Sequence, residues 1–284
     1  MRIDRRFVKR LSRRQFLATA AGGLAAAAGG DALLVEPTAI DVSRHDVVVP
    51  GLPPGLAGLR IAQLTDLHLH GGIHATARAA LVLLARERPD VVVLVGDMCN
   101  RDTDLPWLVA WAKDARGTLA TYATYGNWEH YAEIDRATAE SAYARAGVEF
   151  LCNSAATLRV GDATLALLGL DDPVEGHPDL GATLAGADGA RAGILLLHGP
   201  GYVDTIPRDT APAPALLLAG HTHGGQIRLP FWSPYLPAGS GRFVSGWYRD
   251  TLAPLYVSRG LGTIVVRARL FCRPELPIFT LRAG

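Results

Sequence analysis

The stretch VVVLVGD, residues 91–97, decides the fold. Its first five residues are apolar and four of them are valines, and a short β-branched run of this kind is typical of a strand buried on both faces. Such a strand belongs to a sheet that helices cover. Because Gly96 and Asp97 end the run, the stretch also predicts an acidic side chain at the carboxyl end of a buried strand.

On both sides of this stretch, strand patterns alternate with helix patterns. The expected strands of the first half are 40–49, 59–64 and 118–125, and the expected helices are 74–86, 104–113 and 133–146. This order predicts β-α-β units and an α/β fold. The second half is richer in strands: we expect a hairpin of 157–160 and 164–168, and short buried strands at 194–197 and 216–219.

Composition excludes several classes of protein. The chain has 284 residues, of which 49% are hydrophobic and 19% charged, so it can form a sizeable core and is not intrinsically disordered. Its 31 glycines and 18 prolines follow no fixed period, which excludes a collagen-like chain. The cysteines Cys99, Cys152 and Cys272 are odd in number and unevenly spaced, so they predict neither a disulfide framework nor a zinc ribbon.

Positive charge is concentrated at the N-terminus. Seven of the 28 basic residues lie within the first 14 positions, whereas residues 31–284 carry 21 basic and 26 acidic residues, a net charge of −5. A protein body of that charge has no general attraction for a polyanion. We therefore expect no nucleic acid partner.

Residues 1–35 are typical of an export signal and linker, and residues 36–284 are expected to form a single domain. A basic head that includes Arg13 and Arg14 precedes an Ala/Gly-rich stretch to Gly30. The segment resembles a twin-arginine signal, which implies the twin-arginine export machinery as a partner. It also implies a location in the periplasm, the cell wall or the outer face of the cytoplasmic membrane. A basic tail before a helix and a transmembrane anchor are the alternatives, but the apolar stretch is short of the ~20 residues that span a bilayer.

Residue types that bind metal ions follow five of the apolar runs. They are Asp66 with His68, Asp97, Asn127, His198, and His221 with His223. In α/β sheets, ligands collect at the carboxyl ends of strands, so we expect these side chains to form one site. Oxygen and imidazole ligands suit hard and borderline divalent cations. The absence of cysteine from the set argues against an iron–sulfur cluster or a structural zinc.

Together these segments resemble the calcineurin-like metallophosphoesterase family. The motifs of that family are Asp-x-His, Gly-Asp, Gly-Asn-His-Asp/Glu, an isolated His, and Gly-His-x-His. The matching segments here are 66–68, 96–97, 126–129, His198 and 220–223, and the resemblance covers about residues 40 to 280. It is strongest to the exported or membrane-associated branch, some of whose members cleave UDP-2,3-diacylglucosamine or other phosphodiesters.

The resemblance implies a four-layer α-β-β-α sandwich, in which helices flank two mixed β-sheets. It also implies a centre of two divalent cations (Mn, Fe, Zn or Mg) with the following ligands: Asp66, His68 and His223 on one ion, Asn127, His198 and His221 on the other, and Asp97 between them. The implied reaction is hydrolysis of a phosphodiester, a phosphomonoester or a pyrophosphate through a hydroxide that bridges the two cations. The expected substrate is a phosphorylated small molecule or a lipid-linked or nucleotide-linked phosphate.

One position departs from the family pattern. Trp128 stands where the family usually has a histidine that stabilises the transition state or protonates the leaving group. Because tryptophan cannot transfer that proton, we assign His130 as proton donor or phosphate contact, with a neutral imidazole packed under the loop as the alternative. Glu129 and Asp171 are candidates to accept N–H bonds from the ligand imidazoles.

Asp97, Asn127 and His130 are thus the expected catalytic residues, and Asn127, His130 and Arg259 the expected substrate contacts. An ion pair explains Arg259 equally well. The aromatic residues between positions 230 and 248 are candidates for an apolar lip or for half-buried packing. The alternative function is a non-catalytic binding scaffold with the same fold, but the presence of all seven ligand residues favours the enzyme.

Overall fold

The strands form two mixed sheets in the computed structural model, which describes residues 12–187, 192–229 and 232–284. In spatial order, the first sheet contains β1 (Asp41–Val49), β12 (Glu275–Ala283), β2 (Arg60–Leu64), β3 (Val91–Val95), β4 (Ala120–Thr124) and β5 (Glu149–Phe150). The second contains β10 (Gly246–Tyr248), β11 (Leu255–Val257), β9 (Leu216–Ala219), β8 (Gly193–Leu196), β7 (Ala163–Gly169) and β6 (Ser154–Val160). Strands β2 to β5 are parallel, as are β7, β8, β9 and β11.

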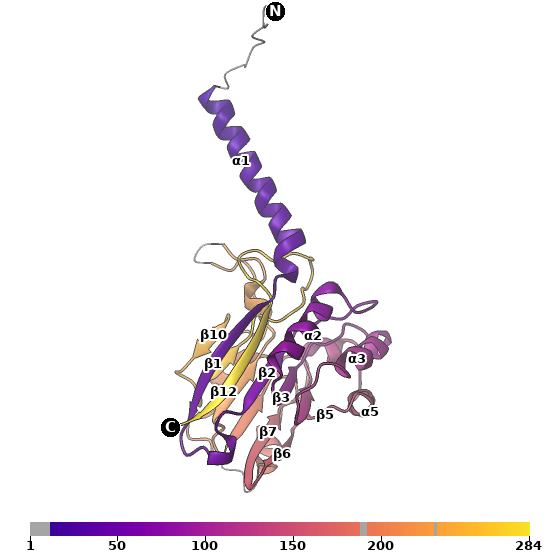
Figure 1. Ribbon diagram of the computed structural model, residues 1–284, viewed down its shortest axis with the longest axis vertical. Coiled ribbons are helices and arrows are strands. Elements are labelled where there is room, and N and C mark those ends of the chain that lie inside the picture. Colours follow the sequence, from indigo (N-terminus) through magenta and orange to yellow (C-terminus); the bar gives the residue numbers. More distant parts are fainter. Residues whose placement is uncertain (1–11, 188–191, 230–231) are drawn as a thin grey trace, which may run out of the picture.

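Helices cover the outer faces of both sheets. The first sheet is covered by α2 (Ala75–Glu87), α3 (Leu105–Ala112) and α5 (Arg136–Arg145) (Figure 1). The shorter helix α6 (Leu180–Ala185) and the 3-10 turn Pro200–Thr205 pack on the second sheet. Other 3-10 turns lie at Pro54–Leu56, Asp102–Asp104 and His223–Gly225. The predicted four-layer sandwich is confirmed.

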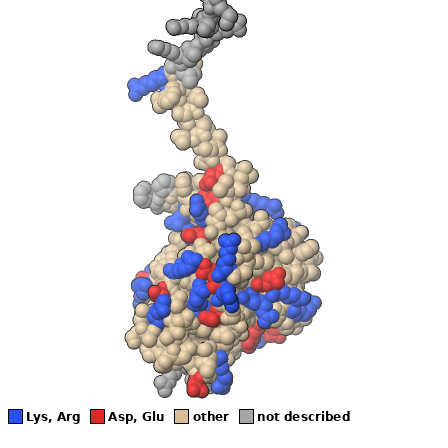
Figure 2. Space-filling view, in the orientation of Figure 1, with Lys and Arg blue, Asp and Glu red and all other residues tan. Residues whose placement is uncertain are grey.

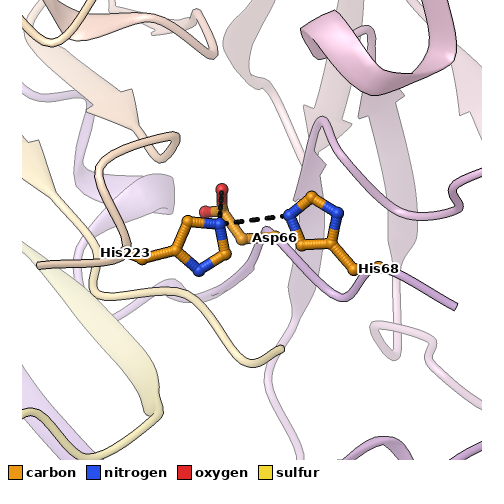
Figure 3. A group of neighbouring side chains, drawn as sticks. All are labelled: Asp66, His68 and His223. Atoms are coloured by element: carbon orange, nitrogen blue, oxygen red, sulfur yellow. Dashed lines mark hydrogen bonds and ion pairs between the residues drawn. The ribbon is translucent and has the colours of Figure 1, made fainter. Parts of the chain in front are cut away.

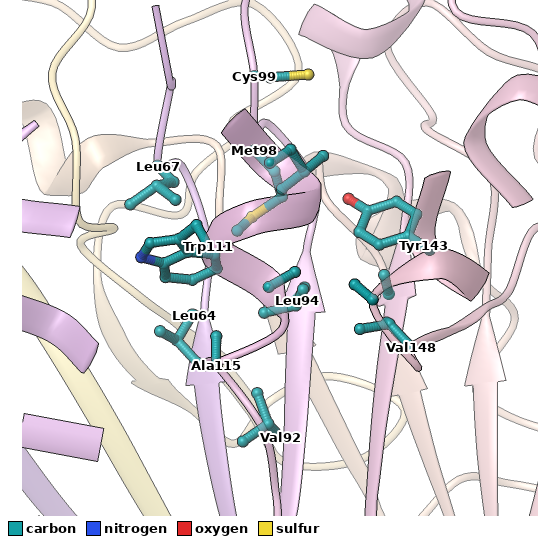
Figure 4. Close-up of a cluster of buried hydrophobic side chains, with 14 of the residues drawn as sticks. Leu64, Leu67, Val92, Leu94, Met98, Cys99, Trp111, Ala115, Tyr143 and Val148 are labelled. Atoms are coloured by element: carbon teal, nitrogen blue, oxygen red, sulfur yellow. The ribbon is translucent and has the colours of Figure 1, made fainter. Parts of the chain in front are cut away.

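Strand β3 packs apolar side chains in both directions. Its three odd-numbered valines face the second sheet, whereas Val92 and Leu94 face the helices, and all five side chains are fully buried. Figure 4 shows the cluster on the helix side, where Trp111 of α3 lies near Leu94. The Trp111 indole N–H donates a hydrogen bond to the Ala77 carbonyl at 2.9 Å. The prediction of a strand buried on both faces is confirmed.

The sequence does not predict β12, which lies between β1 and β2. It pairs in parallel with β1 over its whole length, and its pairing with β2 covers only Ile278–Thr280. Pro277 has no N–H to donate, which argues against an interior strand. In the structure Pro277 is aligned with Ser43 of β1 but lies just outside the residues paired with β2, so its missing N–H takes no hydrogen bond from the β12–β2 pairing.

The segment after β4 is helical where a loop was expected. Asn127–Tyr131 forms the short helix α4, and the helix expected at 133–146 begins later, at Arg136. The Asp135 carboxylate caps α5 by accepting a hydrogen bond from the Thr138 N–H at 2.7 Å.

The N-terminal apolar stretch forms α1 (Arg13–Gly30), which extends away from the two sheets (Figure 1). Helical turns at Asp31–Val35 and Glu36–Thr38 continue it to 26 residues. By length and composition this helix could cross a membrane, so the transmembrane anchor that the short apolar stretch argued against stays open. A signal sequence near an N-terminus has the same properties. The part of the predicted basic head before position 12 lies outside the described residues.

Candidate metal centre

The seven candidate ligands lie just beyond the carboxyl ends of five strands. β2 leads to Asp66 and His68, β3 to Asp97, β4 to Asn127, β8 to His198, and β9 to His221 and His223. All seven are buried, and five of them have φ between +50° and +72°, a conformation that non-glycine residues rarely adopt. Such backbone strain persists only where the surrounding structure enforces it, and it clusters at functional sites.

Asp66, His68 and His223 form the first cluster, with ligand atoms within 4.8 Å of one another. The His223 Nε2 atom lies 3.1 Å from His68 Nε2 and 3.4 Å from Asp66 Oδ1. Figure 3 shows the two imidazole rings pointing toward each other, with dashed lines from His223 to both partners. The structure therefore brings together the three residues that the family resemblance assigned to one ion.

Asp97, His198 and His221 form the second cluster, also within 4.8 Å. Asn127 joins it because its Oδ1 atom lies 2.9 Å from His221 Nδ1. The Asp97 Oδ2 atom lies 3.1 Å from His198 Nε2 and 3.6 Å from His68 Nε2 of the first cluster. The Asp97 carboxylate thus lies between the two clusters.

Three of the imidazoles are held by their outer nitrogen atoms. Each of these atoms bonds to an oxygen: His68 Nδ1 to Asn100 Oδ1 at 2.9 Å, His198 Nδ1 to the Val95 carbonyl at 2.8 Å, and His221 Nε2 to the Ala238 carbonyl at 2.6 Å. Because these oxygens only accept hydrogen bonds, the outer nitrogen carries the proton. In a neutral ring the inner nitrogen then presents a free lone pair.

Those inner nitrogens face other acceptors. Within the described part of the chain, the buried His198 Nε2 makes no hydrogen bond, and His221 Nδ1 faces the Asn127 carbonyl oxygen. Two acceptors without a proton between them repel each other, whereas a cation placed between them attracts both. This mixed nitrogen and oxygen set fits divalent cations, and the seven residues fit two of them.

Burial and neighbouring charges shift the pKa values of these groups. Burial, with a contribution from the Asp97 charge, raises the pKa of Asp66 to about 7. Burial opposes the charge of both Asp97 and His198, but their mutual attraction lowers the pKa of Asp97 to about 2 and raises the pKa of His198 well above its usual value. A cation bound between them would take the place of the His198 proton. Burial lowers the pKa of His221 to about 4, and it lowers the pKa of His223 well below its usual value. The last two rings are therefore neutral at pH 7, as metal ligands must be.

Glu129 does not bond to a ligand imidazole, which corrects the expectation for it. Its carboxylate accepts the backbone N–H groups of Asp97, Met98 and Gly126, at 2.9, 2.6 and 3.0 Å. Glu129 thus fixes the backbone that carries Asp97, and burial raises the pKa of Glu129 to about 7. Among the three groups that bond to the outer nitrogens of the ligand imidazoles, only Asn100 contributes a side chain, and no sequence pattern indicates this role.

Asp171 accepts a hydrogen bond from His130 instead of from a ligand imidazole. Its Oδ1 atom lies 2.8 Å from His130 Nε2, and this bond raises the pKa of His130. Trp128 donates its backbone N–H to Asp97 at 2.8 Å, and its ring packs edge-on against His68. Because residues two apart on a helix point in different directions, His130 does not occupy the position of the Trp128 side chain.

Arg259 forms ion pairs, which were predicted from the sequence as the alternative to a phosphate contact. Its guanidinium donates to Asp41 at 2.8 Å and to Glu275 at 3.2 Å. Cys99 is buried, and burial raises the pKa of its thiol far above the usual range, as expected for a packed apolar group.

Comparison with known proteins gives the family. The model of the calcineurin-like phosphoesterase family matches residues 59–225. The chain is 32% identical to the uncharacterized metallophosphoesterase YkuE of Bacillus subtilis, over 97% of this chain and 99% of that protein. It is 28% identical to the phosphodiesterase YaeI of Escherichia coli, over 95% of this chain and 99% of that protein.

Two further matches are more partial. A transmembrane protein with a metallophosphoesterase domain from Bos taurus is 30% identical over 86% of this chain and 57% of that protein. The solved structure of the Thermus thermophilus sulfate thiohydrolase SoxB matches with a TM-score of 0.45 at 18% identity, over 81% of this chain and 57% of that chain. That structural likeness is too weak to carry weight. The family model and the full-length relatives, together with the two ligand clusters, lead to one conclusion: the chain belongs to the calcineurin-like phosphoesterase family and is a metal-dependent phosphoric ester hydrolase.

Proposed function

We propose that this protein hydrolyses a phosphodiester bond of a lipid-linked or nucleotide-linked substrate at the outer face of the cytoplasmic membrane. The placement of Asp97 carries the proposal, because one carboxylate oxygen lies beside an imidazole from each cluster. The relative YaeI is a phosphodiesterase, which supports a diester over a monoester or a pyrophosphate. The location rests on the apolar helix α1 and on the basic residues at its start.

Two divalent cations (Mn, Fe, Zn or Mg), when bound, supply Lewis-acid polarisation of the phosphoryl oxygens and lower the pKa of a water molecule. Asp66, His68 and His223 would hold one cation, Asn127, His198 and His221 would hold the other, and Asp97 would contribute to both sites.

The remaining groups position the substrate and move protons. The Asn127 carbonyl oxygen faces His221, which leaves the amide N–H groups to donate to a phosphoryl oxygen. The hydrogen bond to Asp171 raises the pKa of His130 and so favours its protonated form, and His130 is our candidate for protonating the leaving oxygen. Arg259 is a second candidate phosphate contact, provided that it exchanges one of its ion pairs for the substrate.

Export by the twin-arginine route is part of the proposal. It would deliver the folded protein to the periplasm, the cell wall or the outer membrane face, and its direct partner would be the twin-arginine machinery. The conservative variant in which Arg13 and Arg14 are both replaced by Lys tests this route. We expect loss of export with retained activity in lysate, and unchanged export would contradict the route.

Hydrolysis of bis(4-nitrophenyl) phosphate with added Mn²⁺ tests the activity. We expect turnover in the wild type and a loss of at least about 10³-fold in Asp97→Asn. Asp162→Asn is the matched control, because Asp162 is exposed in the β6–β7 turn. If no turnover is seen with any of several divalent ions, the alternative of a non-catalytic scaffold is favoured. A panel that includes UDP-2,3-diacylglucosamine then compares substrate classes.

A further inference from the structure

A cavity of about 400 Å³ lies next to the first cluster. Its polar lining includes His68, His70, His74 and Asn100. Residues 261–267 line it as well, together with Leu67, Ala75 and Thr76 and with Leu33, Pro37 and Thr38. A second, largely apolar cavity of about 380 Å³ includes His223, Tyr235 and residues 264–266. Residues 264–266 therefore separate two cavities, each of which reaches a candidate ligand of the same ion.

We call residues 263–272 the rim loop and residues 31–38 the linker. Gln226, three residues after His223, holds the rim loop on one side: its amide donates to the Ile264 carbonyl at 2.9 Å and accepts the Ile264 N–H at 2.8 Å. The rim loop is thus tied to the strand end that provides two of the candidate ligands.

The linker holds the rim loop on the other side. Glu36 is only 4% exposed, and its carboxylate accepts the backbone N–H groups of Phe271 and Cys272. The Ala32 carbonyl accepts the Arg269 N–H at 2.9 Å. The Pro37 carbonyl accepts a hydrogen bond from Thr76 on α2 at 2.9 Å. A buried carboxylate fixed by two backbone N–H groups belongs to the folded body and not to a loose tail.

The linker also continues α1 without a break. α1 is almost wholly exposed, and Figure 2 shows its surface free of charged side chains between its two ends. Apolar side chains at the base of the helix are exposed as well: Leu33, Leu34 and Val35 in the linker, and Val265, Val266 and Phe271 in the rim loop. The face around the two cavities thus exposes apolar side chains where α1 would leave a bilayer, with Arg267 and Asp31 as exposed charged residues beside them.

We propose that the linker is a permanent wall of the substrate site, so that α1 remains attached as a membrane anchor and an apolar chain of the substrate lies against Leu33 and the rim loop. The ligand class is a phosphoester that carries an acyl or prenyl chain. Its phosphate would reach His68, and its chain would run toward the linker. This inference rests on the proposed phosphoesterase activity for its substrate, but the retention of α1 does not depend on that activity.

Two adjacent leucines provide a matched test. Leu33 lines the cavity, whereas Leu34 does not and is 77% exposed. We would assay full-length protein in nanodiscs with 4-nitrophenyl methyl phosphate and 4-nitrophenyl dodecyl phosphate, which share the scissile bond. We expect Leu33→Ser to lower the ratio of kcat/KM for the dodecyl over the methyl diester by roughly 5- to 10-fold, and Leu34→Ser to leave that ratio unchanged. Equal ratios in the two variants would overturn the proposed contact.

The N-terminus of the mature protein tests retention independently of turnover. Intact-mass analysis of the protein extracted from membranes of the native producer should show a chain that still contains α1. A mature chain that begins after Gly30 overturns the proposal whatever the assays give. If neither diester is hydrolysed, the proposed function fails, while the mass still decides whether the anchor is retained.

Discussion

The same strands supply apolar residues to the space between the two sheets and polar, titratable residues to the edge at which the strands end. Between the sheets, the odd-numbered valines of β3 pack against Leu167 and Leu196 with no exposed surface. A few residues further along the chain, the same strands place Asp97 and His198 in equally deep burial. Burial stabilises the first group and opposes the charge of the second.

The strand ends, unlike the space between the sheets, contain groups whose burial and backbone conformation lower the stability of the fold. At the strand ends, burial raises the pKa of Asp66 and Glu129 to about 7, and five of the candidate ligands have positive φ. Both features cost free energy that the apolar core has to offset, as is common at active sites. Substitutions in the two regions should therefore separate stability from activity.

Leu167→Ala should give the largest loss of stability. Leu167 is fully buried between the sheets, so its truncation leaves a cavity and should lower the free energy of unfolding by about 2 to 5 kcal/mol. Turnover per folded molecule should not change. Chemical denaturation and the phosphodiester assay measure the two effects, with Leu119→Ala at a half-exposed position as control. If Leu167→Ala loses activity without losing stability, the separation between a core that provides stability and strand ends that provide activity is wrong.

His130→Ala tests the proton donor. If His130 protonates the leaving group, kcat should fall by about 10²-fold with little change in stability. His177→Ala removes an exposed imidazole from a residue that contacts Asp171 only through its backbone N–H, and it should have no effect. Full turnover in His130→Ala would dismiss the catalytic assignment and leave the bond to Asp171 as a structural contact.

Asn100→Ala should weaken the centre without removing a ligand. It deletes the oxygen that orients His68, so the affinity for Mn²⁺ should fall by roughly 10- to 100-fold. Asn100→Asp keeps an acceptor at that position and should restore most of the affinity. Calorimetric titration of chelator-treated protein gives both values, and equal affinity in Asn100→Ala and wild type would show that the bond is dispensable.

The smallest expected effect is that of pH on the stabilisation by Mn²⁺, and its direction follows from the pKa values. Without a cation, Asp66 and Glu129 bind protons more tightly in the folded than in the unfolded chain between about pH 4 and about pH 7. The stability contributed by these two carboxyl groups therefore falls as pH rises through this window, whereas the lowered pKa values of His221 and His223 act in the opposite direction below about pH 6.5. Cations favour the charged Asp66, so Mn²⁺ should raise Tm more at pH 8 than at pH 5, by roughly 3 °C or more. A larger gain at pH 5 would contradict the assignment of Asp66 as a ligand.

The sequence predicts the candidate site well because each ligand follows its strand directly. The run at 91–97 is a local pattern, and parallel strands bring such ends together. β12 was missed because its partners lie more than 200 residues away and Pro277 argues against a strand. Asn100 and the backbone carbonyls that hold the imidazoles were missed because those bonds depend on loop geometry that no spacing reveals. The helical continuation of α1 into the linker likewise depends on tertiary contacts of Glu36.

Metal content measured on the purified protein tests the central claim most directly. Elemental analysis of protein purified from its native cell should give two divalent ions per chain for the wild type and fewer for Asp97→Asn, with both chains folded. A wild type that holds one ion or none after incubation with Mn²⁺, Fe²⁺, Zn²⁺ or Mg²⁺ would contradict the two-cation centre.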